Sequence, residues 1–433
     1  MRRSLVALAL TAAWAATYPA SGQDMPGDGS CIDCHLQLPE ARLVEPARTF
    51  TTDIHAAAGL GCLACHGTIA AGDARGTRDP RMGFIAVPVP EQIPELCGSC
   101  HSDIQYMKQY DPSLRVDQLA EYRTSGHGQA LAAGDTDVPT CASCHPPHRI
   151  RPPDDPESSV YPTRIADLCG SCHADRSLMS KHGLPNDQFE DYRLSVHGRQ
   201  MIEAEDVSAP TCNDCHGNHG ASPPEVASVE RVCGHCHTMV AEQFEAGGHD
   251  TAFADEGLPG CATCHGNHRI LEPSDADLLA RGEDVCVRCH VGTDTAGVAF
   301  TRMAGWIDSL QEARAGAEAV LRRAENLGME VSQARFELEE VTTALTKARA
   351  AVHAFTIEPV RTELEAGLAV TRTSLERGEY ALLDHRTRRL GLAASTGIIL
   401  MLIGALILKI RQLERSGRAA APEANLAPGR PHD

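Results

Sequence analysis

The sequence predicts a mainly α and irregular fold, in which a loop-rich N-terminal domain is followed by an α-helical coiled coil or hairpin and one transmembrane helix. Three observations predict it. All 18 cysteines and most of the 26 prolines precede residue 298, and so much proline favours short helices and turns. Residues 298–389 carry no cysteine and a single proline, and their apolar residues recur every three or four positions, as on an α-helix. Residues 390–408 form an uncharged apolar run long enough to cross a bilayer.

The cysteines all fall into one motif, Cys-x-x-Cys-His, which occurs nine times with no cysteine left over. It is the attachment motif of c-type haem, in which two thiols bond to the porphyrin and the following histidine ligates iron. A four-cysteine zinc site and a redox disulfide are the alternatives, but neither explains a histidine after every pair. The motifs predict nine covalently attached haems c. The predicted thioether cysteines are Cys31, Cys34, Cys62, Cys65, Cys97, Cys100, Cys141, Cys144, Cys169, Cys172, Cys212, Cys215, Cys233, Cys236, Cys261, Cys264, Cys286 and Cys289.

The histidine that ends each motif is the predicted proximal iron ligand. Aromatic residues make up only 4% of the chain, so the porphyrins are expected to form most of the core of a haem-packed, multihaem cytochrome domain. The predicted proximal ligands are His35, His66, His101, His145, His173, His216, His237, His265 and His290.

The haem region contains an internal repeat. Each repeat has an upstream histidine, a first motif and a second motif. The first motifs start at Cys62, Cys141, Cys212 and Cys261. Three of them are followed three residues later by another histidine, whereas the first repeat has Ile69 there. The chain therefore consists of one leading motif, at Cys31, and four two-haem repeats.

An electron-transfer haem of low potential needs a second strong axial ligand, usually imidazole. Some further histidines recur in register with the repeats, which surface histidines have no reason to do. The predicted distal ligands are His55, His127, His197 and His249, upstream of a first motif, and His148, His219 and His268, just beyond one. The sequence does not reveal which haem each of them serves.

Two haems then have no assigned distal ligand. His182 is one candidate, although the aligned position after His101 is Tyr110. His235 lies inside its own motif and is expected to face solvent or to bond a propionate. Methionine also ligates haem iron, so the alternatives are Met107, Met179 and Met239. Histidines outside the haem region are expected to have no metal role, namely His353, His385 and His432.

The two ends of the chain carry targeting signals. Arg2 and Arg3 precede a short apolar stretch and small residues near Ala20, which is typical of a secretory signal peptide; a retained N-terminal anchor is the alternative. Basic residues flank both ends of residues 390–408, so the orientation rests on the haems, which are attached after export.

The predicted domains are a signal peptide (1–22), a nonahaem cytochrome c domain (23–297), a helical coiled-coil stalk (298–389), a transmembrane helix (390–408) and a short cytoplasmic tail (409–433).

The paired motifs resemble those of multihaem cytochromes that are distantly related to class III cytochromes c. The likeness spans residues 31–290 and rests on the paired motifs, the Ser-x-His-Gly elements at His127 and His197, and Cys-His-Gly-Asn-His at His216 and His265. The resemblance implies low-spin, bis-histidine haems packed as a wire between redox partners. Nine motifs, a helical region and a C-terminal anchor depart from the four-haem class III pattern.

The sequence favours an electron carrier over an enzyme, because an iron with two axial ligands has no open site for substrate. It predicts a single-pass protein on the periplasmic face of a bacterial inner membrane, with its N-terminus outside and its C-terminus inside. The expected partners are a membrane quinol-oxidising donor and periplasmic cytochromes or reductases, with possible oligomers through the coiled coil. A formal net charge of −19 argues against nucleic acid as a partner.

The alternative function is a multihaem reductase of nitrite, hydroxylamine or a sulfur oxyanion, which requires one haem with an open coordination position. The positions where such a haem could occur are the leading motif at Cys31, the motif before Ile69, and any haem that His182 or His235 fails to serve. A third possibility is a subunit of a larger complex that docks through its helical region.

Overall fold

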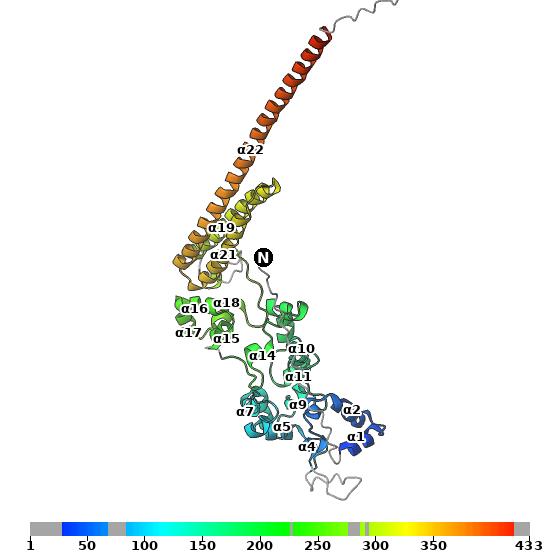
Figure 1. Cartoon of the computed structure of the whole chain (residues 1–433). Coiled ribbons are helices and arrows are strands. Elements are labelled where there is room, and N and C mark those ends of the chain that lie inside the picture. The colour runs from blue at the N-terminus through cyan, green and yellow to red at the C-terminus, as the bar shows by residue number, and fades with distance from the viewer. Residues whose placement is uncertain (1–27, 68–83, 226–227, 276–285, 291–293, 420–433) are drawn as a thin grey trace, which may run out of the picture. The chain divides into compact units, whose positions relative to one another are not determined.

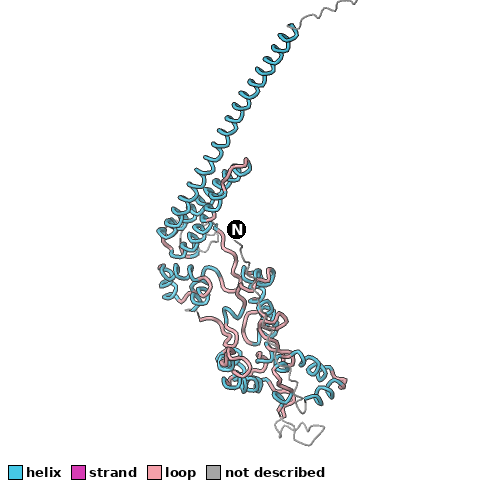
Figure 2. The backbone as a smooth tube through the Cα atoms, viewed as in Figure 1, coloured by secondary structure: helices cyan, strands magenta, loops and turns pink. Residues whose placement is uncertain are grey.

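The computed structural model describes residues 28–67, 84–225, 228–275, 286–290 and 294–419. Helices and loops make up this part of the chain, and no strand occurs in it (Figure 2). The predicted mainly α and irregular fold is therefore confirmed. The predicted signal peptide, Ile69 and the chain from residue 420 onward lie outside the described residues.

The chain divides into two compact units, and the first consists of Met1–Pro224 with His268–Leu271. Its helices are short and separated by loops. They are α1 (Asp28–Leu36), α2 (Ala41–Thr49), α3 (Ile54–Ala57), α4 (Cys62–His66), α5 (Ile93–His101), α6 (Ile104–Met107), α7 (Gln118–Thr124), α8 (Gly126–Ala132), α9 (Cys141–Cys144), α10 (Pro162–His173), α11 (Arg176–Lys181), α12 (Gln188–Leu194), α13 (Val196–Gly198) and α14 (Cys212–His216). Further single turns are Phe50–Thr52, Pro90–Gln92 and Arg199–Glu203.

The second unit consists of Glu225–Asn267 and Glu272–Asp433. It combines short helices around the last haem motifs with long helices that follow them. They are α15 (Val229–Gly234), α16 (Thr238–Ala246), α17 (Gly248–Glu256), α18 (Gly260–His265), η7 (Cys286–Arg288), α19 (Thr295–Asn326), α20 (Ser332–Leu338), α21 (Glu340–Ala351), η8 (Val352–Ala354) and α22 (Ile357–Ala419).

Helices begin at the Pro-Thr-Cys sequences of two of the first motifs. Thr140 and Thr211 are extended residues that precede α9 and α14. The backbone N–H of Thr140 donates to Ser143 Oγ at 3.0 Å, and that of Thr211 donates to Asp214 Oδ2 at 2.7 Å. A side chain that reaches back in this way fixes the first turn of a helix. Each of these two motifs therefore starts a helix of about one turn that carries both cysteines.

The helical region of the second unit packs as three layers: α19, α20 with α21, and α22, which lie side by side (Figure 1). Most of the apolar residues that recur every three or four positions form the core of this region, although Phe336 is exposed. The fully buried ones include Ile307, Leu310, Ala317, Leu321, Ala324 and Val341. The chain turns at Gly328, since α19 ends at Asn326 and Gly328 has a φ of 75°. Pro359 falls in the first turn of α22, where proline costs no hydrogen bond.

Gly367 allows α22 to approach both of its neighbours closely. A Cβ atom at this position would lie 2.8 Å from a methyl group of Leu310 on α19 and 3.1 Å from Ala344 on α21. Leu310 itself is completely buried. The contact of the three helices at this level therefore depends on the absence of a side chain on α22.

The second half of α22 continues beyond the bundle without interruption (Figure 1). Its apolar side chains are exposed, with Leu390 at 73%, Met401 at 71% and Leu408 at 68% of their surface accessible. Among the described helices, α22 is the one long and apolar enough to cross a membrane. The last helix of the bundle therefore runs straight into the apolar segment.

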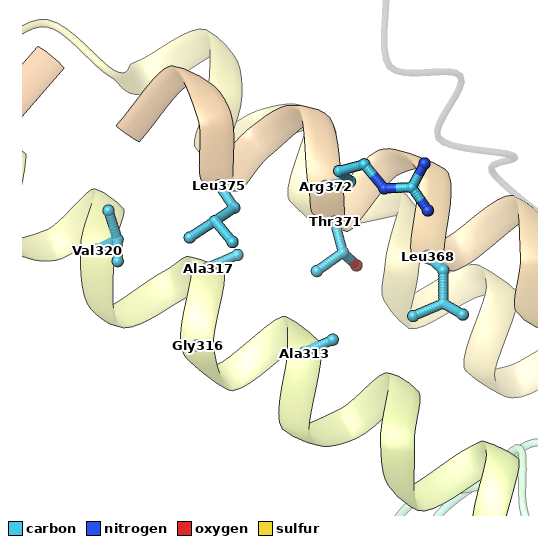
Figure 3. Close-up of a pocket in the computed structure, with 8 residues that line it drawn as sticks. All are labelled: Ala313, Gly316, Ala317, Val320, Leu368, Thr371, Arg372 and Leu375. Atoms are coloured by element: carbon cyan, nitrogen blue, oxygen red, sulfur yellow. The ribbon is translucent and has the colours of Figure 1, made fainter. Parts of the chain in front are cut away.

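A groove lies between α19 and α22 (Figure 3). Small and apolar side chains form most of its surface, with one arginine at the edge. Its lining residues are Ala313, Gly316, Ala317, Val320, Leu368, Thr371, Arg372 and Leu375. It contains no histidine, cysteine or carboxylate, so it offers no ligand to a metal.

Leu310→Ala is expected to destabilise the helical bundle. Removal of a completely buried leucine side chain costs about 2–5 kcal/mol, because it loses apolar burial and leaves a cavity. Denaturant unfolding of the purified chain in detergent, followed by helical circular dichroism, measures the loss. Phe336→Ala is the control, since Phe336 is 73% exposed and should change the free energy of unfolding by no more than about 0.5 kcal/mol. Equal effects of the two substitutions would contradict the packing described here.

Candidate haem-binding sites

Several motif histidines are hydrogen bonded through Nδ1. His35 Nδ1 lies 2.9 Å from the Leu43 carbonyl oxygen, and His66 Nδ1 lies 2.7 Å from that of Ile85. An Nδ1–H that donates to a carbonyl leaves a lone pair on Nε2, which is the usual state of a histidine that ligates a metal. These rings are therefore oriented for ligation by the protein itself.

Motif histidines lie opposite a second histidine at a nearly constant distance. Ring centroids are 5.8 to 6.3 Å apart in these pairs. A metal ion between two imidazoles, with metal–nitrogen bonds of about 2 Å, separates the ring centroids by about 6 Å. The spacing fits one haem iron held between two rings. The pairs are His101–His55, His66–His148, His173–His127, His145–His219, His216–His268, His290–His249 and His265–His353.

The pairs that involve predicted distal ligands follow one rule along the chain. An upstream histidine pairs with the second motif of its own repeat, as in His55–His101, His127–His173 and His249–His290. A histidine just beyond a first motif pairs with the first motif of the preceding repeat, as in His148–His66, His219–His145 and His268–His216. His197 shares the register of the upstream set and stays a predicted distal ligand.

The ring planes divide the pairs into the same two sets. At the first motifs the planes are close to parallel, with angles of 1° for His66–His148, 20° for His145–His219 and 15° for His216–His268. At the second motifs they are steeply inclined, with angles of 86°, 52° and 66°. The histidine pairs at first and second motifs therefore differ in the inclination of their rings.

Burial keeps these imidazoles in the form that ligates iron. Desolvation lowers the pKa of several of the paired rings, and neighbouring histidines lower the pKa of most of these further. The rings concerned are His101, His127, His145, His148, His173, His219, His249 and His268. A neutral imidazole carries the lone pair that a metal requires. No cluster of three or more His, Cys, Asp or Glu side chains suited to a bare metal ion occurs in the described part of the chain.

Backbone hydrogen bonds join successive repeats beside the upstream histidines. The N–H of Ile54, just before His55, donates to the Ile150 carbonyl at 2.8 Å. Equivalent bonds run from Gly126 to Ala221 at 3.1 Å and from Val196 to Ile270 at 2.8 Å. In each case the acceptor stands two residues beyond the downstream histidine of the next repeat. Two predicted distal ligands from different repeats are thus fixed at one junction.

A buried carboxylate strengthens the first of these junctions. Asp53 is 2% exposed, and its Oδ1 accepts hydrogen bonds from the backbone N–H and the Nδ1–H of His55, both at 2.9 Å. Its Oδ2 accepts from the N–H of Ile150 at 2.7 Å. A carboxylate behind a ligating imidazole orients the ring and increases its basicity.

The Ser-x-His-Gly element has a steric explanation. Ser125 is completely buried, and its hydroxyl donates to the Tyr122 carbonyl at 2.6 Å and accepts from the N–H of Gly128 at 2.9 Å. A Cβ atom on Gly128 would lie 1.9 Å from the same Tyr122 carbonyl oxygen. The glycine after His127 is therefore required for the backbone that presents this histidine, and Ser195 and Gly198 repeat the arrangement.

Cysteines of consecutive repeats lie side by side. The thiols of Cys97 and Cys141 lie within hydrogen-bond distance, which raises the pKa of Cys97 and lowers the pKa of Cys141. Cys169 and Cys212 form the same arrangement. In each pair, the second motif of one repeat meets the first motif of the next. Haems attached at these positions would have adjacent edges.

The remaining candidates have other surroundings. His182 Nδ1 lies 3.3 Å from Asp135 Oδ2, and His235 is exposed. Met107 and Met179 are buried at 7% and 4%, whereas Met239 is 44% exposed. None of these side chains has a described contact with a motif histidine, so their roles as ligands stay predictions.

His353 is the residue that the sequence analysis missed. It lies in η8, outside the haem region, yet its ring centroid is 6.1 Å from that of His265 and the two planes are inclined by 26°. The sequence contains one signal that could have revealed it. The fourth repeat has no fifth repeat behind it, so its first motif must find a partner elsewhere.

Comparison with known proteins gives a match to the multiheme cytochrome MtrA of Shewanella baltica (strain OS185). The two chains are 27% identical over 236 residues, which are 50% of this chain and 55% of the relative. The chain thus spans about half the length of the curated relative that it matches. No family model and no solved structure matches the chain. The haem motifs and this match both support a multihaem c-type cytochrome.

Gly128→Ala is expected to displace His127. The added methyl group meets the Tyr122 carbonyl, which cannot move without disturbing α7. The haem at Cys169 should then become five-coordinate, which absorbance and electron paramagnetic resonance (EPR) spectra of the oxidised protein detect as a new high-spin signal. Gly126→Ala is the matched control, because its Cβ atom would meet only the Ala221 carbonyl, at 3.9 Å. An unchanged spin state in Gly128→Ala would refute the steric explanation of the motif.

Proposed function

We propose that the chain is a membrane-anchored nonahaem cytochrome that relays electrons on the periplasmic side of a bacterial inner membrane. The observation that carries this proposal is the set of histidine pairs about 6 Å apart, each of which contains a motif histidine. Each motif would hold one haem through its two cysteines and its histidine. When bound, the haems supply a reversible one-electron change at iron.

The paired rings support relay rather than substrate chemistry. Histidines on both faces leave no position at which a substrate reaches the metal. They also restrict movement of the metal between oxidation states, because each ring is held by its own repeat. The side-by-side cysteines at Cys97–Cys141 and Cys169–Cys212 support a continuous path from one repeat to the next.

The proposed location rests on the two ends of the chain. The long apolar part of α22 supports a single C-terminal anchor, and haem attachment after export supports an N-terminal domain outside. The donor in this proposal is a membrane quinol-oxidising complex, and the acceptors are periplasmic cytochromes or reductases. The domain boundaries remain as proposed from the sequence, at residues 22, 297, 389 and 408.

One observation favours the alternative, a reductase with an open haem. The pairing rule assigns each haem of a first motif to the histidine three residues beyond the next first motif. Applied to the leading motif, with His35, the rule points to position 69, which is isoleucine. The leading haem is therefore a haem for which the repeat pattern supplies no distal histidine.

EPR of the oxidised full-length protein separates the two functions. A relay with nine low-spin haems should show two families of low-spin signals, because parallel imidazole planes split the π-type d orbitals of iron and inclined planes leave them close in energy. A high-spin signal from about one haem in nine, shifted by nitrite or hydroxylamine, would contradict a pure relay. Ile69→His would then remove that signal if the leading haem is its source.

Termination of the chain after Arg389 should release the cytochrome from the membrane. This change removes the exposed apolar part of α22 and leaves the bundle that contains Leu310 intact. Fractionation of cells, followed by haem staining, should find the shortened protein in the periplasm with its haems in place. Retention in the membrane would instead support an N-terminal anchor, and cytoplasmic accumulation would contradict export.

A further inference from the structure

The last repeat presents a problem that the pairing rule does not solve. A histidine from the next repeat lies opposite the first motif in the described pairs His66–His148, His145–His219 and His216–His268. The fourth repeat is followed by the helical bundle, and no further motif follows His290 in the sequence. A ligand for the first haem of this repeat, at His265, must come from outside the repeats.

His353 occupies the place of the missing ligand. Its ring lies 6.1 Å from that of His265, within the range of the other pairs. The planes are inclined by 26°, which belongs with the nearly parallel set at the other first motifs. The distance fits both kinds of site, whereas the inclination agrees with a first-motif site and differs from a second-motif site.

The ring of His353 is prepared for ligation. Its Nδ1 lies 3.1 Å from the Ala350 carbonyl, so an Nδ1–H donates there and leaves the lone pair on Nε2. The single turn of η8 carries the side chain, and Phe355 ends it in the left-handed region, with a φ of 54°. The chain thus leaves α21 sharply at this histidine rather than continuing as a helix.

The next residues reproduce the junction between repeats. In the described junctions, the residue two positions beyond the downstream histidine contacts the segment of the upstream histidine, through Ile150, Ala221 and Ile270. Phe355 stands two positions beyond His353, and its ring centroid lies 3.7 Å from that of His249, the upstream histidine of the fourth repeat. His353 thus corresponds to the downstream histidine of a repeat, and Phe355 corresponds to the residue two positions beyond that histidine.

Polar contacts fix the end of α21 against the haem-bearing segments of the same unit. Arg349 donates to both carboxylate oxygens of Asp275, at 2.8 and 2.7 Å, and Gln311 donates to Asp275 at 2.7 Å. Gly247 lies tightly against the same turn, since a Cβ atom there would meet the Ala354 carbonyl at 3.1 Å. These contacts bring the turn to His265 and His249 without help from a haem motif.

We propose that residues 352–355, the cap segment, replace a fifth repeat, and that His353 is the distal ligand of the haem attached at Cys261 and Cys264. This inference rests on the proposed function only in that it requires a haem at this motif. The helical bundle is then part of a redox centre rather than a passive stalk.

His353→Ala in the full-length protein tests the proposal. Mass spectrometry should still find the full set of haems, because attachment uses the cysteines and His265. EPR of the oxidised protein should show one new high-spin haem and the loss of one member of the parallel-plane family, and added imidazole should restore the low-spin state. His385→Ala, on α22, is the control and should leave the spectrum unchanged.

His353→Met keeps the position filled if alanine disturbs the fold. Methionine raises the potential of a haem that histidine ligates on its other face, so one haem should titrate at a higher potential while helical circular dichroism stays unchanged. A full haem content with an unchanged spin state and unchanged titration in both variants would overturn the assignment of His353. A reduced haem content in the unmodified protein would instead contradict the proposed nonahaem function.

Discussion

The structure depends on pairs of imidazole rings whose centroids lie about 6 Å apart, the distance that one iron atom bonded to both rings requires. In His66–His148, His145–His219 and His216–His268 the two members come from different repeats, so each pair joins segments that are distant in the sequence. A metal bond at each of these points would act as a crosslink. The chain can therefore do with few large apolar side chains in its haem region and still hold many short helices in place.

Much of this arrangement could be predicted from the sequence. The motifs, the upstream and downstream histidines, the apolar stripe from Ile307 to Ala324 and the apolar end of α22 all follow from local patterns. The pairing of the histidines could not be predicted, because the repeat identifies equivalent residues but does not show which of them are in contact. The backbone bonds at Ile54 and Gly126 supply that information, and they become visible only when the repeats are folded together.

His353 shows a different limit of the sequence. It has no equivalent residue in the repeats, since it lies in a helical segment whose composition differs from theirs. Its role becomes clear only because the pairing rule assigns no repeat histidine to His265 and because the turn at Phe355 places His353 beside that residue. A residue that completes a repeated pattern from outside can be recognised only after the pattern has been understood in three dimensions.

The order of ligands along the chain has a consequence for maturation. In the proposed export from the N-terminus, a first motif would emerge before the segment that carries its second histidine. His66 must wait for His148, His145 for His219, and His265 for the cap segment at the end of α21. Each arriving repeat closes the coordination of the one before it, and the helical bundle closes the last.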